Sequence, residues 1–207
     1  MVTTPTVLWS GSSDERDPLV VLLHGRGSNE LEISSLATYL PRHVALACVR
    51  GRVALGEAAF TWFENRGIGR PLPESLRVSI DWFREWLDSV APTRPVVLVG
   101  FSGGTAFAGG LVLDDPARFA GAALLYGTIP FDAGVPTTPQ RLAGVNILHA
   151  QGIDDPVMPS DLMQATWEYL HEDSGAHLEA HRTRGGHAMS PEVTSALSPW
   201  LEGVLAR

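Results

Sequence analysis

Five residues, Gly100-Phe101-Ser102-Gly103-Gly104, place a serine hydroxyl between a strand-like and a helix-like segment. An apolar run, residues 96–99, precedes them, and small helix-compatible residues, 105–113, follow. Gly-x-Ser-x-Gly between a buried strand and a helix is typical of a nucleophile held in a sharp, strained turn. The glycines two residues to either side remove the Cβ atoms that would collide there. Ser102 is therefore a candidate nucleophile, beside a helix N-terminus whose free N–H groups stabilise negative charge.

A serine hydroxyl is a weak nucleophile, so it needs a base that takes its proton during attack. Among seven histidines, His187 is the candidate base, because it follows a Gly-Gly pair after the run His177–Thr183. The base in turn needs a carboxylate that fixes its tautomer and stabilises the imidazolium. Asp154 and Asp155 both follow the run 146–150, and only one of them can point at His187. The residue types alone leave these two candidates.

The elements that must position these residues alternate along the chain. Short apolar runs occupy residues 7–9, 19–23, 44–49, 96–99, 121–126, 146–150 and, with period two, 177–183. Helices are predicted over residues 31–40 and, further on, from Pro73, from Pro159 and from the Ser190-Pro191 cap. Continuously apolar strands alternating with helices are typical of a mostly parallel sheet covered on both faces. No linker or repeat divides the pattern, so residues 1–207 are predicted to form one α/β domain.

The candidate residues fall after different strands of this predicted sheet. Ser102, the Asp154-Asp155 pair and His187 each follow their own strand, and His24-Gly25-Arg26-Gly27 follows a fourth. The carboxyl ends of parallel strands meet at one edge, where open α/β folds place their active sites. The chain order of serine, acid and histidine is that of α/β-hydrolases.

These motifs resemble the phospholipase/carboxylesterase family of α/β-hydrolases, which includes acyl-protein thioesterases and small bacterial carboxylesterases. The matching segments are Leu23-His24-Gly25-Arg26-Gly27, Trp62-Phe63-Glu64, the Ser102 elbow, Asp155-Pro156-Val157-Met158-Pro159 and Gly186-His187. The resemblance covers residues 19–191, nearly the whole predicted domain. Two positions depart from the family pattern: Gly103 stands where glutamine is frequent, and Glu64 stands where aspartate is usual.

The resemblance implies roles for particular residues. The family pattern Gly-x-x-Asp-Pro-Val selects Asp155 over Asp154 as the acid. Attack on an ester creates an oxyanion that needs two prearranged donors. The backbone N–H of Gly103, directly after the nucleophile, is one candidate, and the resemblance implies the backbone N–H of Arg26 as the other.

The substrate pocket is predicted to be open and shaped by loops. Residues 127–145 are too few for a helical cap domain, so the α/β-hydrolase fold is predicted without one. The resemblance implies that Trp62 and Phe63, in the long loop 50–73, line an acyl groove; the alternative is that they anchor this loop to the core. Ile129, in the segment 127–131, is the candidate for the opposite wall. An open site favours short-chain or accessible esters and thioesters over emulsified lipid.

Composition limits the partners and the compartment. A net charge of −8 without a basic run argues against nucleic acid and anionic membranes. The single cysteine, Cys48, excludes an intramolecular disulfide and is expected to be buried in its apolar run. The chain shows no export signal and no membrane-spanning run, so we expect a cytoplasmic protein. No metal or cofactor is expected, because clustered Cys/His ligands and a phosphate-binding glycine loop are missing from the sequence.

The leading interpretation is a serine hydrolase that cleaves carboxylic esters, or thioesters, through an acyl-enzyme on Ser102. An acyltransferase using the same three residues is an alternative, because an alcohol then replaces water in the second step. A catalytically silent binding protein of the same fold is the third. The partner expected for the leading interpretation is a small-molecule ester or thioester. Family members often dimerise, which leaves a homodimer open.

Overall fold

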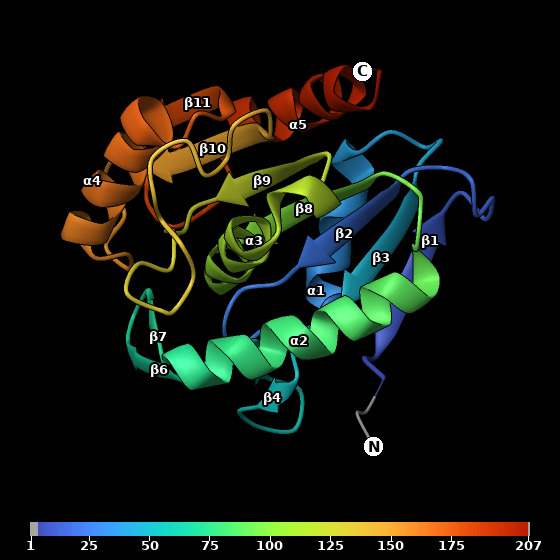
Figure 1. Cartoon of the computed structure of the whole chain (residues 1–207), viewed down its shortest axis with the longest axis horizontal. Helices are drawn as coiled ribbons and strands as arrows, with labels where there is room; N and C mark the ends of the chain where they lie inside the picture. Colours follow the sequence, from blue (N-terminus) through green and yellow to red (C-terminus); the bar gives the residue numbers. More distant parts are fainter. Residues whose placement is uncertain (1–3, 207) are drawn as a thin grey trace.

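The computed structural model describes residues 4–206, and a seven-stranded sheet forms its centre (Figure 1). The strand order is β1-β3-β2-β8-β9-β10-β11. The strands are β1 (Val7–Gly11), β2 (Leu19–Leu23), β3 (Ala45–Val49), β8 (Val96–Phe101), β9 (Gly121–Leu125), β10 (Asn146–Gly152) and β11 (His177–Thr183). Only the edge pair β1–β3 of this sheet is antiparallel. The seven apolar runs of the sequence are confirmed as these seven strands.

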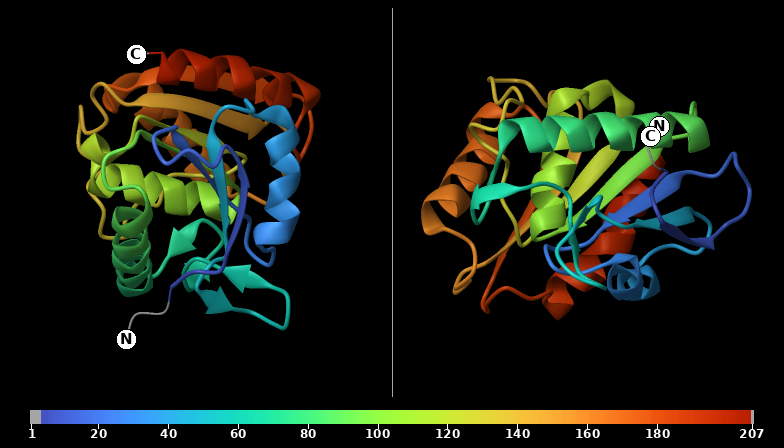
Figure 2. Two further views of the ribbon diagram at one scale, coloured as in Figure 1. Left: turned by 90° about the vertical axis from the view of Figure 1, so that its right-hand side faces the viewer. Right: turned by 90° about the horizontal axis from the view of Figure 1, so that it is seen from below.

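Helices cover both faces of the sheet (Figure 2). One face carries α2 (Pro73–Val90), α3 (Gly103–Asp114) and α4 (Ser160–Glu168), the last continuing into a π-helical turn (Tyr169–Asp173). The other face carries α1 (Glu30–Ile33), a 3₁₀ helix (Ser34–Tyr39) and α5 (Pro191–Leu205). A short 3₁₀ helix (Pro116–Arg118) precedes β9. The predicted α/β-hydrolase fold is confirmed, and the described residues include no cap domain over the sheet.

The predicted spacing of apolar residues positions α2. Leu76, Ile80, Phe83 and Leu87 recur every three or four residues, and all four are fully buried. Pro73 occupies the first turn, where its missing N–H leaves no helical hydrogen bond unmade. This face packs against α3 and the sheet, while the opposite face of α2 carries charged residues.

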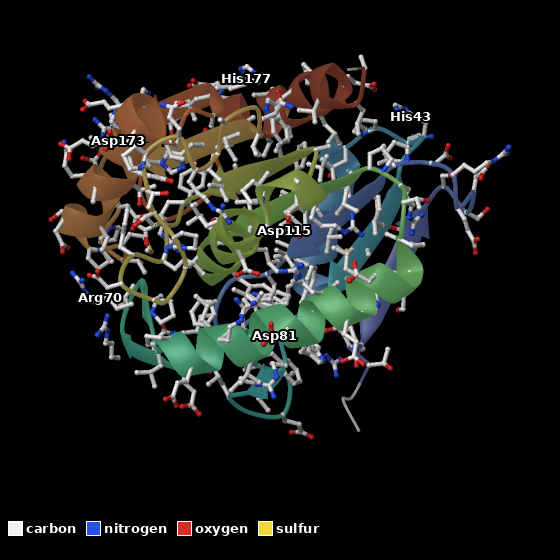
Figure 3. The ribbon with its side chains drawn as sticks, viewed as in Figure 1. His43, Arg70, Asp81, Asp115, Asp173 and His177 are labelled. Atoms are coloured by element: carbon white, nitrogen blue, oxygen red, sulfur yellow. The ribbon has the colours of Figure 1, made fainter. Side chains whose placement is uncertain are left out.

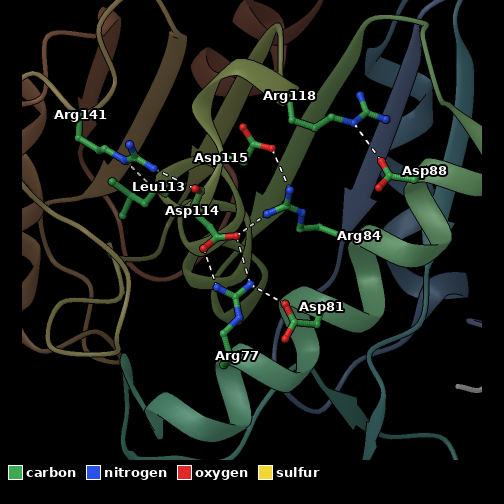
Figure 4. A network of polar contacts seen from close by, with 9 residues as sticks. All are labelled: Arg77, Asp81, Arg84, Asp88, Leu113, Asp114, Asp115, Arg118 and Arg141. Carbon is green, nitrogen blue, oxygen red and sulfur yellow. Dashed lines mark hydrogen bonds and ion pairs between the residues drawn. The ribbon is translucent and has the colours of Figure 1, made fainter.

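An ion-pair network ties α2 to the C-terminal end of α3 (Figure 4). Arg77 and Arg84 of α2 both bind the carboxylate of Asp114, at 2.6 and 2.7 Å. Arg141 donates to the carbonyls of Leu113 and Asp114, both at 2.8 Å, and so satisfies carbonyls that the helix end leaves free. Carboxylates at a helix C-terminus are unfavourable alone, and the arginines offset that charge. The three arginines thus hold the C-terminal end of α3. Its N-terminal end directly follows Ser102.

One predicted helix differs from the structure. Residues 31–40 form the short α1 followed by a 3₁₀ helix rather than one continuous helix. The Asn29 side chain accepts from the N–H groups of Leu31 and Glu32, and so starts α1 directly before Glu30. This start directs Leu31 to solvent, where it is 63% exposed, while Ile33 and Leu36 are buried.

The long loop 50–73 contains two small hairpins. They pair β4 (Val53–Ala54) with β5 (Phe60–Thr61), and β6 (Asn65–Gly67) with β7 (Arg70–Pro71). The second hairpin lies at the same end of the molecule as α4 (Figure 1), and its Arg70 pairs with Asp161 of that helix. Across residues 4–206, no helix is long and apolar enough to cross a membrane.

Candidate active site

Ser102 stands between the end of β8 and the start of α3, in a strained backbone conformation. Its φ of +56° lies in the left-handed region that residues with a side chain rarely adopt. The turn needs both flanking glycines: a Cβ on Gly100 would lie 2.4 Å from the Gly104 carbonyl oxygen, and one on Gly104 would lie 2.1 Å from that of Leu23. The chain therefore passes through the turn only with glycine at both positions.

A continuous chain of hydrogen bonds links Ser102, His187 and Asp155. His187 Nε2 lies 2.7 Å from Ser102 Oγ, and His187 Nδ1 lies 2.7 Å from Asp155 Oδ2. With its proton on Nδ1, the imidazole donates to the carboxylate and accepts from the hydroxyl. The Asp155 side chain is only 1% exposed, and its Oδ1 accepts from the N–H groups of Val157 and Met158. The acid is thus held rigidly, and its free oxygen is directed at the imidazole.

The acid and base loops are aligned by their backbones. Ile153 N–H donates to the Thr183 carbonyl and Asp154 N–H donates to the Gly185 carbonyl. These bonds continue the parallel pairing of β10 and β11 beyond the strand ends. Asp154 itself is exposed, so the structure brings Asp155 to His187 and leaves Asp154 in solvent.

The amides of Arg26 and Gly103 lie beside the serine. A Cβ on Gly103 would stand 3.1 Å from Arg26 N, so the two backbone segments are in contact. Gly103 is the first residue of α3, where an N–H group has no acceptor within the helix. Within residues 4–206, neither amide donates to a protein acceptor. Both donors are therefore available to a negative oxygen formed at Ser102.

His24 fixes the loop that presents Arg26. The fully buried ring donates from Nδ1 to the Gly25 carbonyl, at 2.7 Å, and accepts at Nε2 from the Gly51 N–H, at 2.9 Å. Burial lowers the pKa of His24, so the ring stays neutral and keeps this donor–acceptor arrangement. Trp62 Nε1 donates to the His24 carbonyl at 2.8 Å.

A cavity of about 240 Å³ opens directly beside Ser102. Its lining residues are Arg26, Thr61, Phe63, Asn65, Ile68, Gly69, Ser102, Gly103, Ala106, Val157, Met158 and His187. The cavity is smaller than the pockets of about 300–1,000 Å³ that hold drug-sized ligands. It suits a short, largely apolar group attached to a carbonyl at Ser102.

Two predicted pocket residues need correction. Phe63 lines the cavity, but Trp62 and Ile129 do not. Trp62 is fully buried and stacks on Phe107 of α3 at 4.6 Å, so it anchors the loop to the core. Ile129 is also fully buried and lies against the same helix, where a Cβ on Gly109 would stand 3.3 Å from Ile129 Cδ1.

A second, more open depression of about 360 Å³ also borders Ser102. Ser28, Glu32 and Ser35 give it a polar wall, and Phe101 and Met189 give it an apolar one. The ring of Phe101 lies 5.3 Å from that of His187 and so helps to hold the imidazole. Ser102 therefore lines both hollows.

Cys48 takes no part in this site. It is fully buried on β3, as predicted, and burial raises the pKa of its thiol to about 11. A thiol with that pKa is protonated at neutral pH and is not a nucleophile. Ser102, and not Cys48, lines the cavity.

Several lining residues were not singled out from the sequence. Val157 and Met158 belong to the quoted acid motif, so their place after Asp155 was an available signal. Ala106 lies one turn after the nucleophile on α3, which a helical repeat would have indicated. Asn65 and Gly69 line the cavity because the β6–β7 hairpin folds back, and no local sequence pattern indicates this hairpin.

A parallel sheet with a serine elbow after one strand, and an acid and a histidine after two neighbouring strands, defines an α/β-hydrolase. The model of the Phospholipase/Carboxylesterase family matches residues 9–204, and the chain belongs to this family. The crystal structure of the Bacillus cereus carboxylesterase is similar, with a TM-score of 0.83 and 25% identity, and covers 97% of this chain and 94% of that one. A carboxylesterase from Mesorhizobium loti gives a TM-score of 0.78 at 27% identity, covering 92% and 90%.

Among curated sequences, the chain is similar to "Putative hydrolase MhqD" of Bacillus subtilis (strain 168). The two are 26% identical over 189 residues, which are 89% of this chain and 92% of that protein. Family and relatives alike are hydrolases and carboxylesterases. The chain is therefore an enzyme of the hydrolase class, and ester hydrolysis is the activity that its family supports.

Proposed function

We propose that the protein hydrolyses short carboxylic esters through an acyl-enzyme on Ser102, with His187 as base and Asp155 as its orienting acid. The observation that carries the proposal is the unbroken hydrogen-bond chain from Ser102 Oγ through the imidazole to the buried carboxylate. Each contact has the length of a good hydrogen bond in the resting enzyme.

The geometry suits each chemical step. His187 Nε2 takes the serine proton as Oγ attacks the carbonyl carbon, and Asp155 stabilises the imidazolium that results. The carbonyl oxygen becomes an oxyanion between the N–H groups of Arg26 and Gly103, each worth about 3–4 kcal/mol in the transition state. The imidazolium then gives its proton to the departing alcohol or thiol. A water molecule then gives a proton to His187 Nε2 as its oxygen attacks the acyl carbon. The bond between that carbon and Ser102 Oγ breaks, the imidazolium returns the proton to Oγ, and the carboxylic acid is released.

Each of the two hollows beside Ser102 binds one part of the substrate. The smaller one, about 240 Å³ and largely apolar, receives the acyl group. The more open one, with Glu32 and Ser35 in its wall, receives the leaving group. Since the enclosed side is small, short acyl chains are the preferred substrates, as esters or thioesters.

The test is hydrolysis of a p-nitrophenyl ester series, acetate to laurate, by the wild type and Ser102→Ala. We expect an optimum at short chains and a loss of about 10⁴-fold or more in the variant. Ser195→Ala, on the exposed surface of α5, is the matched control and should keep wild-type rates. Turnover that survives Ser102→Ala would overturn the nucleophile assignment.

A further inference from the structure

Tyr126, the residue directly after β9, combines a strained backbone with a buried side chain that no step of the proposed reaction uses. Its φ of +51° lies in the left-handed region, and only 1% of the residue is exposed. Its N–H donates to the Ala150 carbonyl at 2.8 Å, which prolongs the parallel pairing of β9 with β10 by one residue. Backbone strain of this kind persists where the surroundings impose it, and it is concentrated at active sites.

The Tyr126 hydroxyl holds both ends of the loop that carries His187. β11 ends at Thr183 and Ser190 caps α5, so the loop between them spans residues 184–189. The phenol oxygen accepts from the Ser190 N–H at 3.1 Å and shares a hydrogen bond with Thr183 Oγ1 at 3.2 Å. One oxygen atom thus joins the residue before the loop to the residue after it.

The backbone of this loop needs such restraints. It contains Gly185 and Gly186, and the φ of Gly185 is +129°, a conformation that residues with a side chain rarely adopt. Glycine gives a chain more conformational freedom than any other residue does. Fixed ends reduce the number of conformations that the loop can adopt, and so they restrict where the imidazole of His187 can lie.

The backbone on either side of Tyr126 contacts the serine turn. The Ser102 N–H donates to the Leu125 carbonyl at 2.9 Å. A Cβ on Gly127 would lie 2.5 Å from the Ser102 carbonyl oxygen, so these two segments are in direct contact. Residues 125–127 therefore touch the proposed nucleophile through their backbone and the loop of the proposed base through one side chain.

We propose that Tyr126 is a positioning residue that keeps the imidazole of His187 within hydrogen-bond reach of Ser102 Oγ. This inference rests on the proposed esterase function, in which the imidazole takes and returns a proton in both acylation and deacylation. His187 Nε2 lies 2.7 Å from Ser102 Oγ. A displacement of about 1 Å between reacting groups can cost about 10²-fold in rate. Since Tyr126 lines neither hollow beside Ser102, releasing the loop should slow the chemical steps without weakening substrate binding.

Tyr126→Phe tests the role, because it removes only the hydroxyl and keeps the buried ring. With p-nitrophenyl butyrate, we expect kcat to fall by about 10- to 100-fold and KM to stay within about twofold of the wild type. Acylation and deacylation use the same imidazole, so both slow together and the ratio of their rates, which enters KM, changes little. Steady-state kinetics measure kcat and KM separately.

Tyr169→Phe is the matched control. Tyr169 begins the π-helical turn that ends at Asp173, labelled in Figure 3. It is 6% exposed, its hydroxyl donates to the Thr138 carbonyl at 3.3 Å, and it lines neither hollow. This variant also loses a tyrosine hydroxyl that bonds within the protein, so it should lower Tm yet keep the wild-type kcat. A merely structural role for Tyr126 would give both variants wild-type kcat.

Thr183→Val tests the other partner of the same hydroxyl. Valine keeps the shape of threonine and removes the oxygen that Tyr126 contacts, while the bond to the Ser190 N–H remains. We therefore expect a smaller fall in kcat, of about threefold to tenfold, again at constant KM. Added to Tyr126→Phe, this substitution should cost little more, because the first change has already removed the bond between the two side chains.

The outcomes distinguish the two proposals. A folded Tyr126→Phe variant with wild-type kcat, or with a change in KM alone, overturns the positioning role and leaves the esterase proposal standing. If Tyr126→Phe does not fold, Thr183→Val decides: a fall in kcat at constant KM supports the role, and an unchanged kcat overturns it. A wild type that hydrolyses no ester, or a Ser102→Ala variant that keeps the wild-type rate, overturns the esterase proposal itself.

Discussion

Asp154 and Asp155, which follow β10, have the same side chain but differ in how far it is exposed to solvent. Asp155 is buried, with one oxygen held by two backbone N–H groups and the other directed at His187. Asp154 is exposed. Since only the first can orient the imidazole, its loss should leave the histidine in the wrong tautomer.

Asp155→Asn should therefore lower kcat by about 10³–10⁴-fold, while Asp154→Asn should stay within about twofold of the wild type. Steady-state hydrolysis of a short p-nitrophenyl ester measures both, and circular dichroism checks that each variant is folded. The opposite pattern, with Asp154→Asn inactive and Asp155→Asn active, would show that the acid is misassigned.

The sequence predicts which three side chains meet in the hydrogen-bond chain better than it predicts the residues around them. Ser102, Asp155 and His187 each follow a strand, and parallel strands end at one edge, so their meeting follows from the strand pattern. Trp62 and Ile129 could not be placed in this way. Whether an aromatic or aliphatic side chain in a loop faces a cavity or the core depends on how the loop packs, and both choices bury apolar area equally well.

At the scale of secondary structure, the arginines of α2 stabilise the C-terminal end of α3. Arg77 and Arg84 share the Asp114 carboxylate, and their side chains are 41% and 38% exposed, so solvent screens part of the attraction. We expect Arg77→Met and Arg84→Met each to lower the free energy of unfolding by about 1 kcal/mol. Urea denaturation at neutral pH measures this, with Arg42→Met as control, since Arg42 forms no ion pair with any described residue.

The same network predicts an acid response. The hydrogen bond from Arg77 lowers the pKa of Asp114. A carboxyl with a lowered pKa stabilises the fold at pH values above its ordinary pKa of about 4, and this contribution is lost as the pH falls further. The stabilities of wild type and Asp114→Asn should therefore converge below pH 4. A difference between them that stays constant down to pH 2.5 would contradict the ion-pair explanation.

Elements with strong periodicity were predictable, and short ones were not. α2 follows from four apolar residues at helical spacing, and β11 follows from its alternation. The segment 31–40 also contains apolar residues at helical spacing. The Asn29 cap sets where α1 starts, however, and after Ile33 the chain continues as a 3₁₀ helix. The hairpins β4–β5 and β6–β7 have strands of two or three residues, too short to carry a periodic signal.

The stability of the whole molecule should fall in mild acid because of one buried histidine. His149 of β10 is fully buried, donates from Nδ1 to the Leu124 carbonyl and has no partner at Nε2 among the described residues. Burial lowers its pKa from 6.5 to about 4. The unfolded chain therefore takes up this proton at a higher pH than the folded protein does.

Between pH 6.5 and 4, this histidine should remove about 3 kcal/mol from the free energy of unfolding, and above pH 6.5 it should remove nothing. His149→Asn can keep a donor for the Leu124 carbonyl but does not titrate. Urea denaturation at pH 7 and pH 4 should show the variant gaining about that amount relative to the wild type. If both proteins lose the same free energy of unfolding between pH 7 and pH 4, groups other than His149 control the acid sensitivity.

The distance along the chain between the reacting residues has a consequence for how the protein matures. Ser102 and His187 are 85 positions apart, and four neighbouring parallel strands, β8 to β11, must pair before they meet. A nascent chain that has emerged only as far as β9 already carries Ser102, yet has neither Asp155 nor His187. With the proposed mechanism, ester turnover therefore reports completed folding, because an intermediate in which β10 and β11 have not yet joined the sheet is inactive.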